Sequence, residues 1–117
     1  MKFLWTTIHV SDLDRSIAFY NGLLELPVVE RFFGNGNEIA MLGEEDGTHL
    51  ELLCKPGKPE AAGQGVSIGF AFPDIEAMGD KLTAAGCQVS PIIQPNPSVK
   101  FRFVSDPDGY AVQLVER

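Results

Sequence analysis

The chain carries a faint internal repeat at a spacing of 62 residues, and no other feature of the sequence constrains its fold as strongly. The segment V-S-D-L, beginning at Val10, aligns with F-P-D-I, beginning at Phe72. On the same register, E-E-D-G-T-H-L-E-L-L from Glu44 aligns without a gap with D-P-D-G-Y-A-V-Q-L-V from Asp106. A duplication of this size predicts two copies of one supersecondary unit, so that a site can form between them.

Length and composition predict one ordinary globular domain. The 117 residues are 44% hydrophobic and 21% charged, which is enough for one real core. The formal charge is −7 and the nine Lys and Arg are scattered, so nucleic-acid binding is excluded. No apolar run is long enough to cross a bilayer, and we expect a cytoplasmic protein without a membrane partner. Cys54 and Cys87 are expected to be reduced thiols in or beside the core.

The periodicity predicts the order β-α-β-β-β twice, as module one (1–54) and module two (66–117), joined by a Pro- and Gly-rich linker (55–65). Ser11 is expected to cap the first helix and Asp74 the second, with Gly86 at the end of the second. Module one should have strands at 3–10, 28–33, 38–42 and 48–54. Module two should have strands at 66–72, 88–93, 100–104 and 110–116. Residues 94–98 are expected to form a loop, in contrast to the hairpin turn at 34–37.

Strand alternation divides each sheet into a helix-packed face and a second face of small, polar and aromatic residues. On the second face of module one, Trp5, Thr7 and His9 share a row, and His49 and Glu51 share another. The repeat pairs Trp5 with Ser67 and Glu51 with Gln113. Four positions on the second face can therefore converge on one point.

These patterns, with H-V-S-D-L-D-R-S-I-A-F-Y near the start, T-H-L-E-L-L in mid-chain and D-P-D-G-Y-A-V-Q-L-V at the end, resemble the vicinal oxygen chelate superfamily. That group contains glyoxalase I and the bleomycin-resistance proteins. The resemblance implies an α+β fold whose two modules form an open, barrel-like mixed sheet around a cleft, with the helices outside, commonly in a homodimer. Glyoxalase I, the branch that looks most similar, isomerises the hemithioacetal of methylglyoxal and glutathione around a divalent metal.

The resemblance also places the family's four metal ligands on this chain, and only one strong ligand is retained. The His or Gln of the first position falls on Trp5, which has no lone pair for a metal. The Glu of the second falls on Glu51 and is present. The usual His of the third falls on Ser67, and the Glu that also serves as catalytic base falls on Gln113, whose amide is a poor proton acceptor. Because a catalytic metal site needs three or more protein ligands, we expect no metal at this position.

Each candidate residue also has a plainer interpretation. Trp5 suits a core or interface position as well as ligand stacking, and His9 suits an ordinary strand hydrogen bond as well as a ligand or base. Glu51, on a half-buried strand, needs a partner, and we expect His9, His49 or Gln113. The candidate ligand-binding residues are Trp5, Thr7, His9, His49, Glu51, Ser67, Phe103 and Gln113.

Two functions remain open from the sequence. The first is a protein that binds a small organic molecule in the cleft without a cofactor, as bleomycin-resistance proteins do. The second is a glyoxalase-like lyase or isomerase. That enzyme would use metal-free acid–base chemistry by Glu51 and His9, or a displaced zinc or nickel site of His9, His49, Glu51 and Gln113. A dimeric scaffold with a vestigial cleft is a third interpretation, and the ligand's identity is open in all three.

Overall fold

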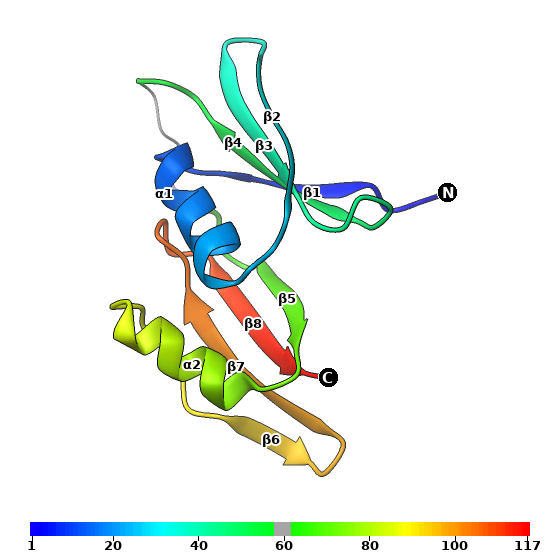
Figure 1. Ribbon diagram of the computed structural model, residues 1–117, viewed down its shortest axis with the longest axis vertical. Coiled ribbons are helices and arrows are strands. Elements are labelled where there is room, and N and C mark those ends of the chain that lie inside the picture. The colour runs from blue at the N-terminus through cyan, green and yellow to red at the C-terminus, as the bar shows by residue number, and fades with distance from the viewer. Residues whose placement is uncertain (58–61) are drawn as a thin grey trace. The chain divides into compact units, whose positions relative to one another are not determined.

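Both halves of the chain adopt the β-α-β-β-β order that the repeat predicts (Figure 1). This computed structural model describes residues 1–57 and 62–117 and divides into two units, Met1–Ala62 (unit 1) and Gly63–Arg117 (unit 2). Residues 58–61 of the expected linker lie outside the described residues. Unit 1 contains β1 (Trp5–His9), α1 (Leu13–Ile17) with a π-helical turn η1 (Ala18–Leu23), β2 (Val28–Gly34), β3 (Asn37–Leu42) and β4 (His49–Cys54). Unit 2 contains β5 (Ser67–Phe72), α2 (Ile75–Ala84), β6 (Ile93–Asn96), β7 (Val99–Ser105) and β8 (Ala111–Glu116).

Each unit has a four-stranded mixed sheet of the same topology. The strand orders are β1-β4-β3-β2 and β5-β8-β7-β6, with the first strand parallel to the last and the other pairs antiparallel. This is the α+β architecture expected from the sequence. The helix of each unit packs on one face of its sheet, and we call the opposite face the open face.

The core of each unit lies between its helix and its sheet, on the strand rows that alternation assigned to the helix side. Leu52 of β4 and Leu114 of β8, which are 62 residues apart, are both 0% exposed. The predicted stripe of α2 is also buried, at Ile75, Met78 and Leu82. Neither helix in the described part of the chain has the length and apolar character needed to cross a bilayer.

Equivalent turns join the last two strands of each unit. In unit 1, Gly47 N donates to Glu44 O at 3.0 Å, and in unit 2, Gly109 N donates to Asp106 O at the same distance. The carboxylate of Asp106 is 5% exposed and also accepts from the backbone N–H of Tyr110. The D-P-D-G turn is therefore held by a buried Asp side chain, a common use of Asp in turns.

The predicted start of the first helix is wrong by one residue. Asp12, and not Ser11, is the N-cap, and its carboxylate accepts from Arg15 N at 3.0 Å. Asp74 caps α2 in the same way, by accepting from Glu76 N and Ala77 N. Asp12 and Asp74 are identical positions of the repeat, so the duplication indicated the correct cap where local preference for Ser did not.

The expected strand at 88–93 and loop at 94–98 are also wrong. Only one isolated bridge forms early in that segment, between Val89 and Val104, and the strand β6 is Ile93–Asn96. Asn96 pairs with Val99 across a two-residue turn, as Gly34 pairs with Asn37 in unit 1. Pro95 obscured this strand in the sequence, but β6 is a sheet edge, where proline's missing N–H costs no ladder hydrogen bond.

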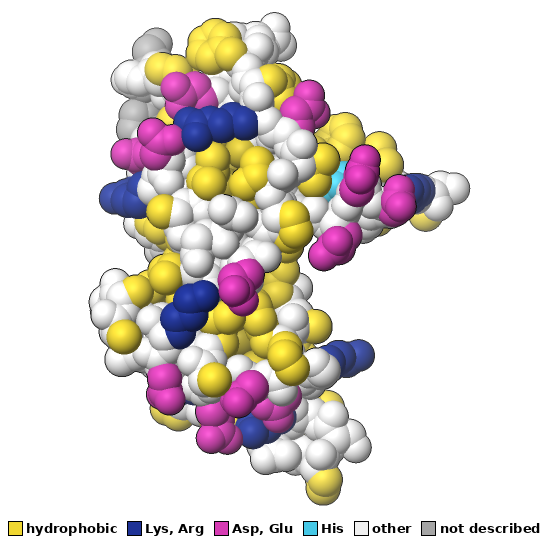
Figure 2. All heavy atoms as spheres, in the orientation of Figure 1, with side chains coloured by type: hydrophobic (Ala, Val, Ile, Leu, Met, Phe, Trp, Pro, Cys, Tyr) yellow, Lys and Arg dark blue, Asp and Glu magenta, His cyan; other side chains and the backbone are white. Residues whose placement is uncertain are grey.

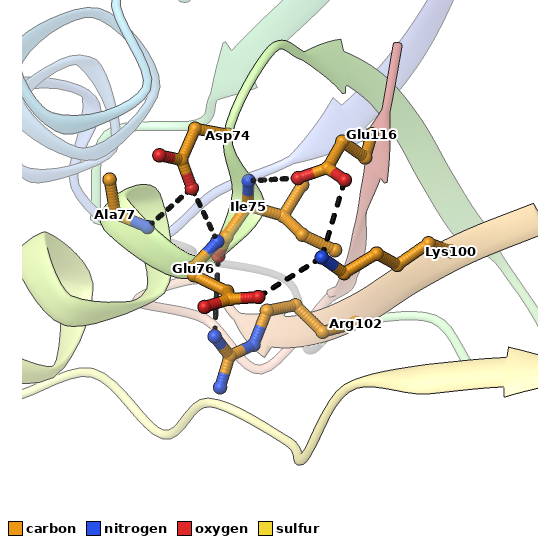
Figure 3. A network of polar contacts seen from close by, with 7 residues as sticks. All are labelled: Asp74, Ile75, Glu76, Ala77, Lys100, Arg102 and Glu116. Atoms are coloured by element: carbon orange, nitrogen blue, oxygen red, sulfur yellow. Dashed lines mark hydrogen bonds and ion pairs between the residues drawn. The ribbon is translucent and has the colours of Figure 1, made fainter.

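A network of polar contacts ties α2 of unit 2 to its sheet (Figure 3). Arg102 of β7 donates from Nη1 to Ile75 O at 3.2 Å, and from Nε and Nη2 to Ser90 O at 3.1 and 3.0 Å. Lys100 lies 3.0 Å from Glu76 Oε1 and 3.3 Å from Glu116 Oε2. Hydrogen bonds to Glu76 and then to Glu116 raise the pKa of Lys100 above its usual value.

The Arg102 guanidinium lies against the helix at Gly79. A Cβ at position 79 would lie 2.7 Å from Arg102 Cζ, closer than carbon atoms pack. Any larger residue at position 79 must therefore shift the guanidinium, which strains its hydrogen bonds to Ile75 O and Ser90 O.

We expect Gly79→Ala to destabilise the protein by about 1–2 kcal/mol, because disrupted contacts of Arg102 outweigh the helix preference of alanine. In an Arg102→Ala background the same substitution should stabilise by about 0.5–1 kcal/mol, since only the helix preference remains. Urea unfolding of the four proteins measures this double-mutant cycle. If Gly79→Ala changed the free energy of unfolding in the same direction in both backgrounds, the packing of Arg102 against Gly79 would be contradicted.

Candidate functional site

The open face of unit 1 carries five of the eight candidate ligand-binding residues. On the paired strands β1 and β4, Trp5 lies opposite His49, Thr7 opposite Glu51, and His9 opposite Leu53. Residues opposite each other in a sheet project from the same face, so these six side chains form two adjacent rows. Trp5 is 49% exposed, and its ring is therefore available to a ligand.

Glu51 accepts a hydrogen bond from a residue that the sequence did not indicate as its partner. Thr7 Oγ1 donates to Glu51 Oε1 at 2.6 Å, a short distance typical of a hydroxyl bonded to a carboxylate. The expected partners were His9, His49 or Gln113. Thr7 takes that place because the parallel register sets it directly opposite Glu51.

His49 lies at one end of its row in a crowded position. Its Nε2 is buried and makes no hydrogen bond within the described part of the chain. Gly43, with φ of 132°, allows the close approach, since a Cβ there would lie 3.2 Å from His49 Cδ2 and 3.0 Å from the Thr48 carbonyl oxygen. Only glycine readily adopts that backbone conformation.

The open face of unit 2 carries the other three candidates on strands β5, β7 and β8. Ser67 lies opposite Ala111, Gly69 opposite Gln113, and Phe103 on the other side of Gln113. A Cβ on Gly69 would lie 3.5 Å from Gln113 Oε1, so the amide extends over the glycine. Gly69 is the repeat equivalent of Thr7. Gln113 therefore has no hydroxyl opposite it on β5, whereas Glu51 has that of Thr7.

A pocket of about 290 Å³ opens beside Phe103 on unit 2. Its walls include Phe103 and Ser105 of β7, Ala111 of β8, and the segment 88–90. Phe103 was a predicted site residue, but the other lining residues were not predicted, because residues 88–93 were expected to form a regular strand. Two backbone hydrogen bonds hold the segment 88–90 to β7. Ser90 N donates to Phe103 O at 2.8 Å, and Ser105 N donates to Gln88 O at 3.2 Å.

The resemblance places metal ligands at Trp5, Glu51, Ser67 and Gln113, and this set of residues does not suit a divalent metal. Trp5 offers no lone pair, and Ser67 and Gln113 are weak neutral donors, so Glu51 is the one strong donor among the four. Among residues 1–57 and 62–117, no three His, Cys, Asp or Glu side chains are grouped as metal ligands are. Cys54 and Cys87 form no disulfide within the described part of the chain, and burial raises the pKa of Cys87.

The sequence matches the glyoxalase/bleomycin resistance protein/dioxygenase superfamily over residues 2–114. A lactoylglutathione lyase of Haemophilus influenzae is 33% identical, with 99% of this chain and 93% of that protein aligned. A glyoxalase I from Leishmania major has a similar structure, with a TM-score of 0.83, 28% identity, and coverage of 99% of this chain and 86% of that one. An antibiotic binding protein from a Streptomyces species shares the fold, with a TM-score of 0.79, 19% identity and coverage of 99% and 95%.

The family match spans nearly the whole chain, and the bacterial relative aligns over nearly its full length. The two mixed sheets and their helices have the architecture of the solved relatives. This chain therefore belongs to the glyoxalase/bleomycin resistance protein/dioxygenase superfamily.

Proposed function

We propose that this protein binds a small organic molecule through the open faces of its sheets, without the divalent metal of its enzymatic relatives. The observation that carries the proposal is the donor set at the four family positions, Trp5, Glu51, Ser67 and Gln113. An aromatic ring, a hydroxyl and an amide are the groups that hold organic ligands, whereas metals are held by imidazole, carboxylate and thiolate.

The hydrogen bond from Thr7 supports the same proposal. A carboxylate that accepts a short hydrogen bond from a side chain is held in one orientation, which suits the recognition of a ligand N–H or O–H. Phe103 and its pocket add an apolar surface in unit 2. The proposal includes the homodimer that is common in the family, which sedimentation of the purified protein would test.

The second candidate is a glyoxalase-like lyase or isomerase. It is supported by the 33% sequence identity between this chain and the lactoylglutathione lyase of H. influenzae. In this chain the chemistry would rest on Glu51 as the base and His9 as the second proton-transfer group, or on a displaced metal site that includes His49 and Gln113. His49 and Glu51 share one row of β4, and His9 lies on the neighbouring strand.

Metal content separates the two candidates. We expect the protein purified without chelator to carry only traces of zinc or nickel, and added zinc or nickel to leave the melting temperature unchanged. The triple variant Trp5→His, Ser67→His, Gln113→Glu restores the family's donor set and should gain about one metal per site. Stoichiometric metal in the wild-type protein that is lost in Glu51→Gln, or turnover of the methylglyoxal–glutathione hemithioacetal, would favour the enzyme.

Ligand binding has a direct optical readout because Trp5 is the only tryptophan of the chain. Compounds that bind should change Trp5 fluorescence and raise the melting temperature, since a ligand at 100 times its Kd adds about 2.7 kcal/mol of stability. Thr7→Val should weaken binding of the same compounds severalfold by freeing the Glu51 carboxylate. Thr6→Val, on the helix-packed row of the same strand, is the matched control. A compound library that produces neither signal would refute the binding function.

A further inference from the structure

The lysine and arginine side chains of the strands lie on the helix-packed faces of the sheets. Three cations lie within the described strands, Arg31 of β2 and Lys100 and Arg102 of β7. Each one contacts the helix side of its unit. Arg31 lies 2.7 Å from Asp14 of α1, Lys100 lies 3.0 Å from Glu76 of α2, and Arg102 donates to Ile75 O of α2. The described strands therefore offer no lysine or arginine on either open face.

Carboxylates are present on the open face of unit 1. Glu51 lies opposite Met41, and Glu30 lies on the other side of Met41, so both project from the same face. On the surface shown in Figure 2, basic side chains lie beside acidic ones, with apolar side chains exposed around them. On the open face of unit 1, a negatively charged group would meet carboxylates and no strand lysine or arginine, and like charges repel.

The open face of unit 2 provides an uncharged pocket. The pocket residues Phe103, Ala111 and Val89 are apolar, and Ser90, Ser105 and Gln88 are neutral and polar. Phe103 packs edge-to-face with Phe101, with ring centroids 5.8 Å apart, so that Phe101 supports one side of the ring. A volume of about 290 Å³ is large enough for a fused-ring or branched apolar group.

Hydrogen bonds hold the wall of the pocket at Ser90 in place. Ser90 Oγ accepts from Phe103 N at 2.8 Å, and Ser90 O accepts the two hydrogen bonds from Arg102. A fixed wall lowers the entropy lost on binding, which is a general source of affinity.

We infer that the ligand carries a neutral apolar ring or chain, that this part is seated in the pocket beside Phe103, and that the pocket disfavours anionic groups such as those of glutathione conjugates, because its lining is uncharged. This inference rests on the proposed binding function and specifies its ligand class. The carboxylates of the glutathione tripeptide would need cations that the open-face strands do not supply.

Two probes of nearly identical shape test the charge preference. N-phenyl-1-naphthylamine is neutral, and 8-anilinonaphthalene-1-sulfonate adds one sulfonate to the same framework. Fluorescence titration should give a saturable Kd for the neutral probe that is on the order of five- to tenfold lower than for the sulfonate. Ser67→Lys places a cation opposite Ala111 and should reduce the difference in Kd between the two probes. Ser67→Met is the control for side-chain length.

A pair of matched variants tests the location. Ala111→Phe fills the pocket and should weaken binding of the neutral probe at least tenfold, whereas Ala71→Phe, on the same open face opposite Val115, should leave it unchanged. In the wild-type protein the probe should shift the backbone amide signals of Ser90, Phe103, Ser105 and Ala111. These shifts keep the test valid even if a variant folds poorly.

The outcomes separate this inference from the proposed function. Tighter binding of the sulfonate probe or of S-lactoylglutathione than of the neutral probe would overturn the charge preference and leave the binding function standing. Amide shifts confined to unit 1, or equal effects of Ala111→Phe and Ala71→Phe on probe binding, would contradict the location of the ligand in this pocket. If neither probe nor any compound of a mixed library binds, the binding function itself fails.

Discussion

The parallel pairing of the first and last strand in each unit is the constraint on which the rest of the structure depends. It sets β1 against β4 and β5 against β8, so that one row of side chains packs on the helix and the next projects from the open face. The buried leucines at 52 and 114 hold this register, because a slip of one residue would move every core side chain to the other face. Thr7 lies opposite Glu51, and Gly69 opposite Gln113, for this reason alone.

The two units have kept the backbone of the duplicated module and have changed its side chains. Arg102, which clamps α2 and the edge segment in unit 2, has the buried Ala40 as its repeat equivalent, and Gly79 has Ile17. Unit 1 therefore fills the space between helix and sheet with apolar atoms where unit 2 uses a guanidinium bonded to backbone carbonyls. In unit 2 the guanidinium also holds Ser90, which lines the pocket beside Phe103.

The chemistry of the open faces follows from how the strands distribute charge. Arg31, Lys100 and Arg102 contact acidic or carbonyl groups on the helix side of their units, and Glu51 and Glu30 project from the open face of unit 1. The open face of unit 1 also carries Trp5, and that of unit 2 carries Phe103 beside an uncharged pocket. The proposed preference for a neutral apolar ligand group rests on the chemistry of that pocket.

The sequence by itself determined the duplicated fold and the two faces of each sheet, because these follow from periodicity and from residue type at repeat positions. It also contained two facts that local preferences concealed, the Asp12 cap and the β6 hairpin, both of which lie on the 62-residue register. Only the tertiary structure decided that Thr7 holds Glu51, that Arg102 packs on Gly79, and that the segment 88–90 walls a pocket. These features depend on strand register and on side-chain packing between segments distant in the chain, which no local pattern of residues specifies.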